Sequence, residues 1–208
     1  MKKAFTMLEL IMVIVVVGIL TAIMIPRFSD DKLREAADQI ISHIRYTQHL
    51  AMIDDRYDPT NQYWYNERWQ IGFWQCTNGD WYYIVGHDLD HGGGIGSSEA
   101  ATNPSDGKLL FTSNACNLGS DQSGEILISK KFGITNITFS NGCGANQYIA
   151  FDNVGRPYQS TLSATATAPN IYDLVDQTCI IHFTANDGDF NISIEPETGY
   201  VHLSSINY

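Results

Sequence analysis

The sequence predicts an α+β fold in which one long N-terminal helix packs on an antiparallel β-sheet head. Three observations predict it. An apolar run near the N-terminus leads into a segment with helical periodicity at 33–51. From residue 69 onward, short aromatic and β-branched runs alternate with turn sequences, which is typical of strands. A helix with one apolar face that precedes a series of strands can cover a sheet.

The N-terminal stretch consists of Lys2 and Lys3 followed by an apolar run that ends at Pro26. A helix that spans the ~30 Å hydrocarbon layer needs roughly 20 mostly apolar residues, and residues 5–26 meet this need. We therefore expect a single transmembrane helix at 5–26. Because basic flanks stay on the cytoplasmic side, the long C-terminal part is expected on the opposite side of the membrane.

Glu9 is the one carboxylate inside this apolar run. An acidic group in a helix within hydrocarbon costs roughly 2.5–3.5 kcal/mol on insertion scales, so it requires a partner. If a protease cuts after Ala4, the new α-amino group of Phe5 lies one helical turn before Glu9. The two charges can then neutralise each other within one chain or between neighbouring chains. Pairing between neighbours would make the helix self-associating.

The residues Ala4-Phe5-Thr6-Met7-Leu8-Glu9, followed by a long apolar run, resemble the class III signal of type IV pilins and type II secretion pseudopilins. This resemblance implies a leader peptide at 1–4, cleavage between Ala4 and Phe5 by a prepilin peptidase, and N-methylation of Phe5. The family usually has Gly before the cut, and Ala4 is a small substitute for it. An ordinary secretory signal peptide fits less well, since Glu9 interrupts the apolar run and no Ala-x-Ala-like site follows.

The same resemblance implies a role and a location for the chain. Glu9 would guide docking of the helix beside other subunits. Gly18 and Pro26 fall where many members have a helix-loosening glycine and a proline, so a bend is expected there. The chain would lie in the bacterial inner membrane with its C-terminal domain in the periplasm, and would assemble into a pilus or pseudopilus. Its expected partners are other pilins or pseudopilins, the prepilin peptidase and an inner-membrane assembly platform.

Beyond Pro26 the helix is expected to resume, with Ser29 or Asp30 as its cap, and to continue as an amphipathic half at 27–56. From Thr6 to about Met52 it would form one stem on the order of 70 Å long. Apolar residues at spacings of three, four and seven predict its buried face: Leu33, Ala37, Ile40, Ile44 and Ala51. Charged residues between them predict its solvent face: Lys32, Arg34, Glu35, Asp38 and Arg45.

The rest of the chain, 57–208, is predicted to be a β-rich head that follows a break at 54–61. Its clearest feature is a hairpin of strands at 69–74 and 81–85 around the turn Asn78-Gly79. Further strands of the same sheet are expected at 109–111, 126–129, 134–139, 148–151, 178–183, 190–194 and 200–203. Surface loops are expected at 160–170 and at 86–107, the latter being too rich in Gly, Ser and Asp to bury itself.

Two short motifs in the head narrow the resemblance. Ile149-Ala150-Phe151-Asp152-Asn153-Val154-Gly155-Arg156, together with Gly199 before the last strand, resembles H-type minor pseudopilins and FimT-like minor pilins. This likeness implies a structural subunit, a minor pseudopilin of a type II secretion pseudopilus. No motif in the sequence marks an enzyme, so no enzymatic activity is expected. A type IV pilus major or minor pilin used in adhesion, motility or DNA uptake is the alternative. A membrane-anchored periplasmic enzyme is the different-class alternative, and it requires a pocket of convergent polar groups.

Four cysteines, an even number, are expected on the exported side, where disulfides persist. They allow three connectivities: any two pairs among Cys76, Cys116, Cys143 and Cys179. Sequential pairing, Cys76 with Cys116 and Cys143 with Cys179, is preferred because each bond would staple a loop to adjacent strands. Free thiols buried as small hydrophobes are the alternative.

The charge of the chain argues against nucleic-acid binding. The net charge is −11, and loss of Lys2 and Lys3 with the leader takes it to −13. Binding to a phosphate backbone needs clustered Lys and Arg, and beyond the leader only Lys130-Lys131 forms a basic pair. The aromatic residues between 63 and 83 could stack bases or sugars if exposed, but such residues more often fill a core.

One loop has the residue types of a metal site. Asp88-Leu89-Asp90 resembles the start of a calcium loop, and Glu99 is the twelfth residue from Asp88. Gly92-Gly93-Gly94 supplies no side-chain ligand between them, so a solvated loop is preferred over a Ca²⁺ site, with Asp88 and Asp90 as weak candidate ligands. No phosphate-binding loop, nucleophile elbow or catalytic triad spacing occurs in the sequence.

Overall fold

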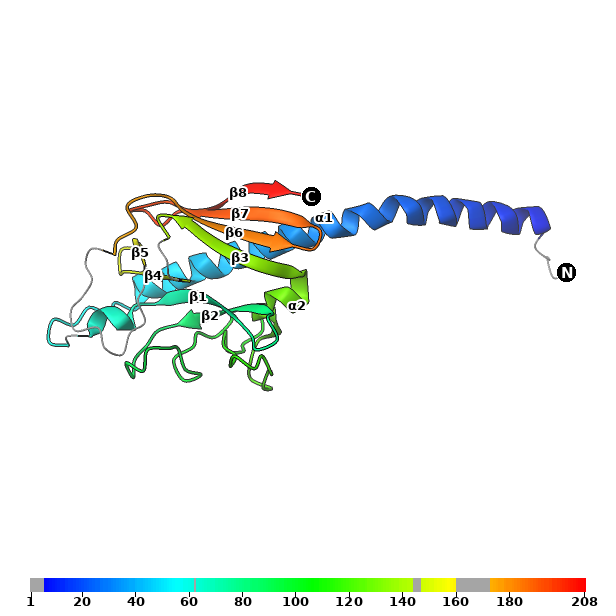
Figure 1. Ribbon diagram of the computed structural model, residues 1–208. Coiled ribbons are helices and arrows are strands. Elements are labelled where there is room, and N and C mark those ends of the chain that lie inside the picture. The colour runs from blue at the N-terminus through cyan, green and yellow to red at the C-terminus, as the bar shows by residue number, and fades with distance from the viewer. Residues whose placement is uncertain (1–5, 62, 144–146, 160–172) are drawn as a thin grey trace.

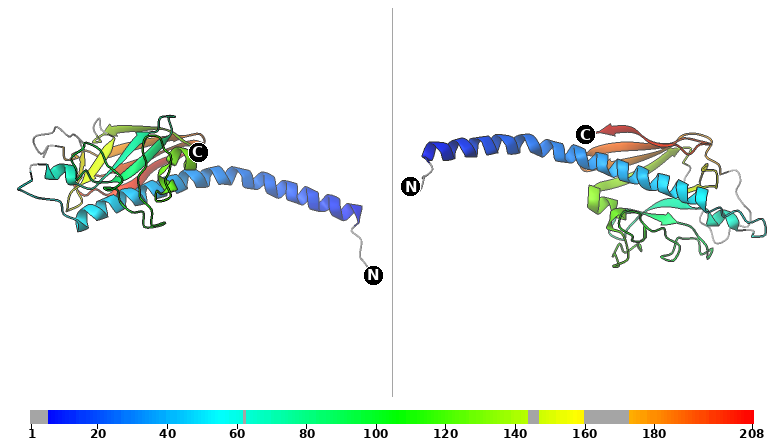
Figure 2. Two further views of the ribbon diagram at one scale, coloured as in Figure 1. Left: turned by 90° about the horizontal axis from the view of Figure 1, so that it is seen from below. Right: turned by 180° about the vertical axis from the view of Figure 1, so that it is seen from behind.

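The computed structural model describes residues 6–61, 63–143, 147–159 and 173–208, without the side chains of residues 22–31. The long helix α1 (Met7–Ile53) extends far beyond the head at its N-terminal end, whereas its C-terminal half lies against the sheets of the head (Figures 1 and 2). The described strands form antiparallel sheets, so the predicted α+β class is confirmed. The expected surface loop at 160–170 lies outside the described residues.

A capping box starts α1 at Met7. Thr6 has an extended backbone, and its hydroxyl accepts a hydrogen bond from the backbone N–H of Glu9 (3.3 Å). The carboxylate of Glu9 in turn accepts one from the backbone N–H of Thr6 (3.3 Å). Two N–H groups that have no partner inside the helix are satisfied in this way, which fixes where the helix begins.

The helix α1 is continuous from Met7 to Ile53. Ser29 and Asp30 lie inside the helix, so the expectation that one of them caps a resumed helix is wrong. The capping residue is Thr6, because the chain never leaves the helical conformation in between. Figure 2 shows α1 as a gently curved rod. Gly18 and Pro26 both lie within it, and the bend expected at these residues stays a prediction.

The predicted faces of the C-terminal half of α1 are confirmed. The apolar positions are each at most 3% exposed: Leu33, Ala37, Ile40, Ile44 and Ala51. The charged positions are all exposed: Lys32, Arg34, Glu35, Asp38 and Arg45. An apolar stripe of this width must be covered by other elements, and here it packs against strands of the head.

The described strands form two sheets, not the single sheet expected. The first has the order β2-β1-β4-β5 and the second β3-β6-β7-β8. Their bounds are β1 (Gln70–Gln75), β2 (Trp81–Gly86), β3 (Ile134–Asn141), β4 (Tyr148–Phe151), β5 (Pro157–Gln159), β6 (Cys179–Ala185), β7 (Gly188–Ile194) and β8 (Val201–Asn207). Alternating polarity shows that a strand buries one face, but it does not specify which strands pair, which explains the wrong count of sheets.

Aromatic side chains join the two sheets beneath α1. The Phe73 ring of β1 contacts the rings of Phe139 and Phe183 in the second sheet, at centroid distances of 5.9 and 5.7 Å. Phe183 stacks on Phe190 at 4.8 Å. α1 contacts β7 and β8 of one sheet and β1, β2 and β4 of the other. The core therefore lies between both sheets and the buried face of the helix, and the aromatic runs mainly fill it, as predicted.

Two expected strands are absent from the described residues. The segment 109–111 forms only isolated bridges, and 126–129 falls in a 3₁₀ turn η2 (Gly124–Ile126) and a short helix α2 (Ile128–Phe132). A short apolar run does not by itself separate a strand from a turn of helix, which accounts for both errors. A further 3₁₀ turn, η1 (Trp64–Glu67), and the strand β5 were not predicted.

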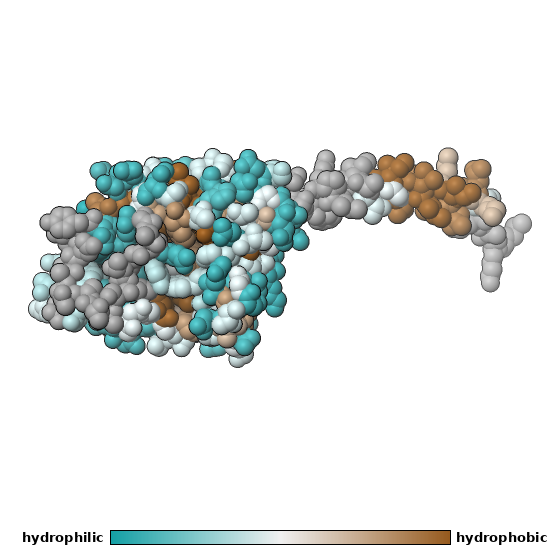
Figure 3. Space-filling model, in the orientation of Figure 1, coloured by the Kyte–Doolittle hydropathy of each residue, from teal (hydrophilic) through white to brown (hydrophobic). Residues whose placement is uncertain are grey.

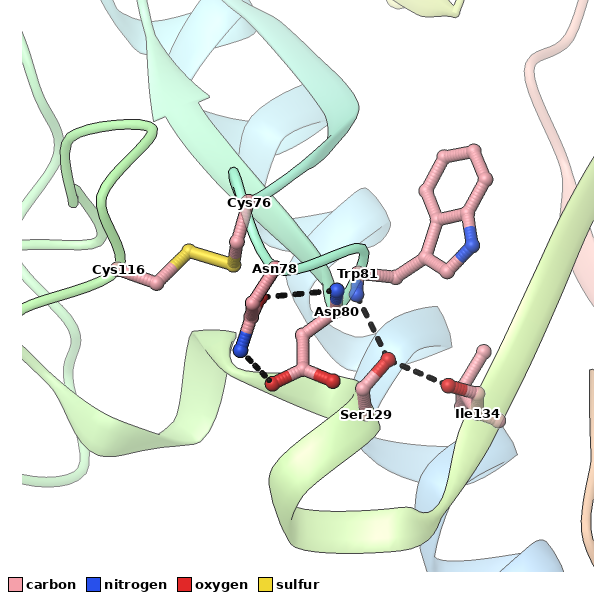
Figure 4. The surroundings of a disulfide bond; sticks show 7 residues. All are labelled: Cys76, Asn78, Asp80, Trp81, Cys116, Ser129 and Ile134. Carbon is pink, nitrogen blue, oxygen red and sulfur yellow. Dashed lines mark hydrogen bonds between the residues drawn. A yellow bond between two sulfur atoms is a disulfide. The ribbon is translucent and has the colours of Figure 1, made fainter.

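Both disulfides form as preferred from the sequence: Cys76 with Cys116 and Cys143 with Cys179. Figure 4 shows the first, which ties the irregular segment after β2 to the β1–β2 hairpin. Beside it, the Ser129 hydroxyl of α2 accepts a hydrogen bond from the Trp81 N–H (2.7 Å). Closure of loops of 40 and 36 residues is worth about 2–4 kcal/mol each in the chain-entropy account.

The two motif glycines meet over the end of α1. The Gln48 side chain donates hydrogen bonds to the Gly155 carbonyl (2.8 Å) and the Thr198 carbonyl (3.1 Å). Gly199 has a φ of +62°, and a Cβ there would lie 2.3 Å from the Gly155 carbonyl oxygen. Only glycine fits this position without a backbone shift. The motifs thus hold the β4–β5 and β7–β8 turns together on the helix.

Gly199→Ala is expected to destabilise the protein by about 2–4 kcal/mol, because it adds a backbone clash to the strain of a positive φ. Gly107→Ala is the matched control, since Gly107 has a φ of +70° and open space around it. The control is expected to cost only about 1 kcal/mol. Urea unfolding of the two variants measures the difference, and equal losses would contradict the contact.

Candidate functional site

A continuous apolar surface covers the N-terminal part of α1. We call residues Met7–Leu20 the apolar segment; it appears brown in Figure 3. Its large apolar side chains are 52–84% exposed: Met7, Leu8, Leu10, Ile11, Met12, Val13, Ile14, Val15, Val16, Val17, Ile19 and Leu20. Single exposed apolar residues are ordinary, but a large contiguous patch marks a surface that contacts protein or lipid.

The carboxylate of Glu9 is the one charged group of the apolar segment. It lies at the tip of the helix, where it accepts hydrogen bonds from the N–H and the hydroxyl of Thr6, each 3.3 Å long. The helix macrodipole also favours a negative charge at this end. The expected cleavage point Ala4/Phe5 and the amino group of Phe5 lie outside the described residues.

The described part of the chain contains no helix long and apolar enough to cross a membrane. Residue 5 and the side chains of residues 22–26 are not among the described atoms, so the membrane helix expected at 5–26 stays a prediction.

The acidic loop at 87–99 is more ordered than the sequence suggested. Most residues of the expected surface loop at 86–107 are not buried, but Asp88 is fully buried and Glu99 is only 5% exposed, which was not expected. One oxygen each of Asp88, Asp90 and Glu99 lies within 4.8 Å of the others. Glu99 at the twelfth position therefore does lie beside the two aspartates, which the glycines between them had argued against.

Backbone amides of the loop explain why its carboxylates can be buried. Asp88 accepts hydrogen bonds from the N–H groups of Gly92 and Gly93, both at 3.0 Å. Glu99 accepts three, from Leu89 (2.6 Å), Asp90 (3.0 Å) and Gly96 (2.7 Å). The glycines thus contribute donors, not ligands. Burial raises the pKa of Asp88, and these hydrogen bonds only partly offset it.

The acidic loop can hold itself together without a cation. Carboxylate oxygens are the ligands that Ca²⁺ prefers, and the three side chains lie close enough to share one ion. Five backbone donors already neutralise part of their charge. The expected weak ligands Asp88 and Asp90 therefore do lie close together. The hydrogen bonds to the backbone explain this arrangement as part of the loop structure, without an ion.

A second candidate site is a cleft of about 400 Å³ at the C-terminal end of α1. We call it the end cleft. Five aromatic, three arginine, three aspartate and two other residues line it: Tyr57, Trp64, Trp69, Phe151, Tyr158, Arg56, Arg68, Arg156, Asp54, Asp55, Asp152, Asn153 and Ala51. The end of α1, η1 and the β4–β5 turn thus meet around one hollow. From the sequence, 54–61 was predicted only to be a break between the helix and the strands.

Ion pairs and hydrogen bonds fix the polar groups of the end cleft. Asp54 accepts hydrogen bonds from Arg56 (2.6 Å) and from the Trp69 indole N–H (2.9 Å). Burial alone would raise the pKa of Asp54, but these hydrogen bonds outweigh it and hold the pKa below its usual range. Asp152 accepts one from the Arg156 guanidinium at 2.7 Å.

The end cleft is the pocket of convergent polar groups that the enzyme alternative requires. Its described lining has no Ser, Cys, His or Lys, so nucleophilic and general-base chemistry would have to come from the carboxylates or from the hydroxyls of Tyr57 and Tyr158. The carboxylates of Asp54 and Asp152 are held in ion pairs with arginines. Such an arrangement suits binding better than proton transfer.

Sequence patterns found some of these features and missed others. The Asp152-x-x-Gly155-Arg156 motif signalled the turn at one wall of the end cleft. Arg68 was not predicted as a site residue. Its position in the sequence between Trp64 and Trp69 could have indicated it, because a planar guanidinium can stack on aromatic rings. Comparison of the chain with known protein families, with characterised proteins and with solved structures finds no match.

Glu99→Gln is expected to loosen the acidic loop, because one acceptor oxygen cannot serve three N–H donors and the new amide group faces donors. The loss should be about 1–3 kcal/mol of local stability. Hydrogen exchange of the backbone amides of Leu89, Asp90 and Gly96 should become faster. Glu197→Gln, at an exposed turn, is the control and should leave this exchange unchanged. Unaltered protection in Glu99→Gln would contradict the assigned role.

Proposed function

We propose that this chain is a structural subunit of a pilus-like filament, in particular a minor pseudopilin of a type II secretion pseudopilus. The observation that carries the proposal is the apolar segment, an exposed helical surface that extends beyond the head. Water does not stabilise such a surface, so lipid must cover it before assembly and neighbouring helices after it. The prepilin-like residues around Ala4 and Phe5 supply the route to that assembly.

In this proposal the chain enters the inner membrane through residues 5–26 with its head in the periplasm. A prepilin peptidase removes residues 1–4 and methylates the amino group of Phe5. The apolar segments of successive subunits then pack side by side in the filament core. The assembly platform adds subunits at the base, so that the growing filament can push exported proteins outward.

Glu9 has the position that such docking requires. Its charge is expensive in hydrocarbon unless an opposite charge lies nearby. The amino group of Phe5 in the processed chain, either its own or that of the preceding subunit, supplies this charge. A subunit whose Glu9 finds the amino group of a neighbour is held in one axial register. The capping box accounts for the shape of the helix end, whereas the charge accounts for the register.

The head is held rigidly enough to follow the helix. The buried face of α1 packs on both sheets, and Gln48 bonds two turns of the head at its far end. Arg45 donates a further hydrogen bond to the Val201 carbonyl (2.6 Å). A force on the stem is therefore transmitted to the head, as a subunit in a moving filament requires.

Two substitutions at Glu9 separate charge from helix capping. Glu9→Ala removes both, whereas Glu9→Gln keeps a side-chain acceptor for the capping box and removes the charge. Both variants are expected to insert in the membrane and to fall at least about tenfold in the purified filament fraction, since an unpaired amine is left among apolar helices. Immunoblots of membrane and filament fractions measure this.

Glu35→Gln is the matched control on the same helix. Glu35 is exposed in the half of α1 that packs on the head, and it forms an ion pair with Lys131 at 3.6 Å. Loss of an exposed ion pair costs little stability, so this substitution should not affect incorporation. Normal incorporation of Glu9→Gln would show that the charge plays no part in docking. Absence of the wild-type chain from every filament fraction would contradict the proposed function itself.

A further inference from the structure

The end cleft has no part in the proposed assembly. Its lining residues come mainly from the C-terminal end of α1, from the segment around η1 and from the β4–β5 turn. These elements lie at the end of the head farthest from the N-terminus of α1 (Figures 1 and 2). A subunit packed through its apolar segment keeps this end away from the packed helices. The cleft belongs to the head and the end of α1, so what it binds does not depend on how the chain assembles.

Aromatic rings form the floor and the rim of the end cleft. Trp69 and Tyr158 are less than 10% exposed and belong to the floor. Tyr57 is 60% exposed, and its ring meets the ring of Trp64 edge-on at a centroid distance of 5.0 Å. An exposed tyrosine held against a tryptophan offers a fixed apolar surface at little further entropic cost on binding.

The charges of the end cleft cancel. The lining has three arginines and three aspartates, and two pairs are formed: Asp54 with Arg56 at 2.6 Å and Asp152 with Arg156 at 2.7 Å. An anionic ligand would have to compete with an aspartate for Arg56 or Arg156, and a cationic ligand with an arginine for Asp54 or Asp152. Breaking such a partly buried pair is costly. A neutral ligand with many hydroxyl groups can instead add hydrogen bonds to both partners of a pair without separating them.

The guanidinium of Arg68 lies against two aromatic rings of the cleft. Its guanidinium lies 3.9 Å from the centre of the Tyr158 ring and 4.8 Å from that of Trp64. Its Nε is buried and has no hydrogen-bond partner within the described ranges. Burial lowers the pKa of Arg68, which remains a cation at neutral pH.

We propose that the end cleft binds a neutral saccharide. One face of a pyranose ring carries C–H groups and packs on an aromatic ring, whereas its edge carries hydroxyls that both donate and accept hydrogen bonds. Tyr57 and Trp64 supply the aromatic surface, and Asn153 with the arginine–aspartate pairs supplies planar polar partners. The volume of about 400 Å³ falls within the roughly 300–1,000 Å³ typical of small-ligand sites.

The test uses the full chain in a zwitterionic detergent that carries no sugar headgroup. Probes are the neutral oligosaccharides maltotriose, cellotriose, chitotriose and lactose, with 3′-sialyllactose as the anionic partner of lactose. Titration calorimetry measures binding, and a change in tryptophan fluorescence gives a second readout, since two of the four tryptophans, Trp64 and Trp69, line the cleft. At least one neutral probe is expected to bind with a dissociation constant below about 1 mM.

Tyr57→Ala is expected to weaken that binding by roughly five- to tenfold. Tyr200→Ala is the matched control, because Tyr200 is 58% exposed, close to the 60% of Tyr57, and lies outside the cleft. It should leave binding within about twofold. Asn153→Ala, a second exposed position, should weaken binding by at least about threefold through a lost hydrogen bond. Circular dichroism confirms that each variant is folded.

Three results would overturn the inference. One is failure of every neutral probe to bind below about 1 mM. Another is binding of sialyllactose alone, which would make the ligand an anion. The third is binding that Tyr57→Ala and Asn153→Ala leave unchanged, which would place the site elsewhere on the chain.

Discussion

The structure depends on one helix whose two halves have different environments. The C-terminal half of α1 buries Leu33, Ile40 and Ile44 against the head, whereas the large apolar side chains of the apolar segment at its N-terminal end are exposed. Burial of a large aliphatic side chain is worth about 1.5–3 kcal/mol relative to exposure. The C-terminal half of α1 gains this free energy by packing on the head of its own chain. The apolar segment can gain it by contact with other molecules.

This division explains the arrangement of the head. Because α1 presents one stripe, both sheets direct strands to the same stripe, and the rings of Phe73 and Phe183 close the space between them. The irregular segment after β2 has few regular strands to hold it. A disulfide and the hydrogen-bonded carboxylates of the acidic loop hold it instead. The end cleft forms where α1 stops and the turns of the head close around its last residues.

Sequence patterns predicted the parts that local chemistry specifies. Helical spacing gave the buried positions of α1, and Asn78-Gly79 gave the first hairpin. The division into two sheets was missed because β1 pairs with β4, a contact that no local pattern encodes. Burial of Asp88 was missed because it depends on glycine N–H groups brought round by the loop. The prepilin-like residues pointed to the apolar segment, whereas the end cleft arises from segments far apart in the chain.

The most direct test of the account asks what covers the apolar segment in the cell. A photo-crosslinking amino acid at Ile14, which is 61% exposed, would be compared with the same group at the exposed Lys32. The account predicts that position 14 forms adducts with the stem helices of other filament subunits and that position 32 does not. Adducts of position 14 with lipid alone, in cells that assemble the filament, would contradict it.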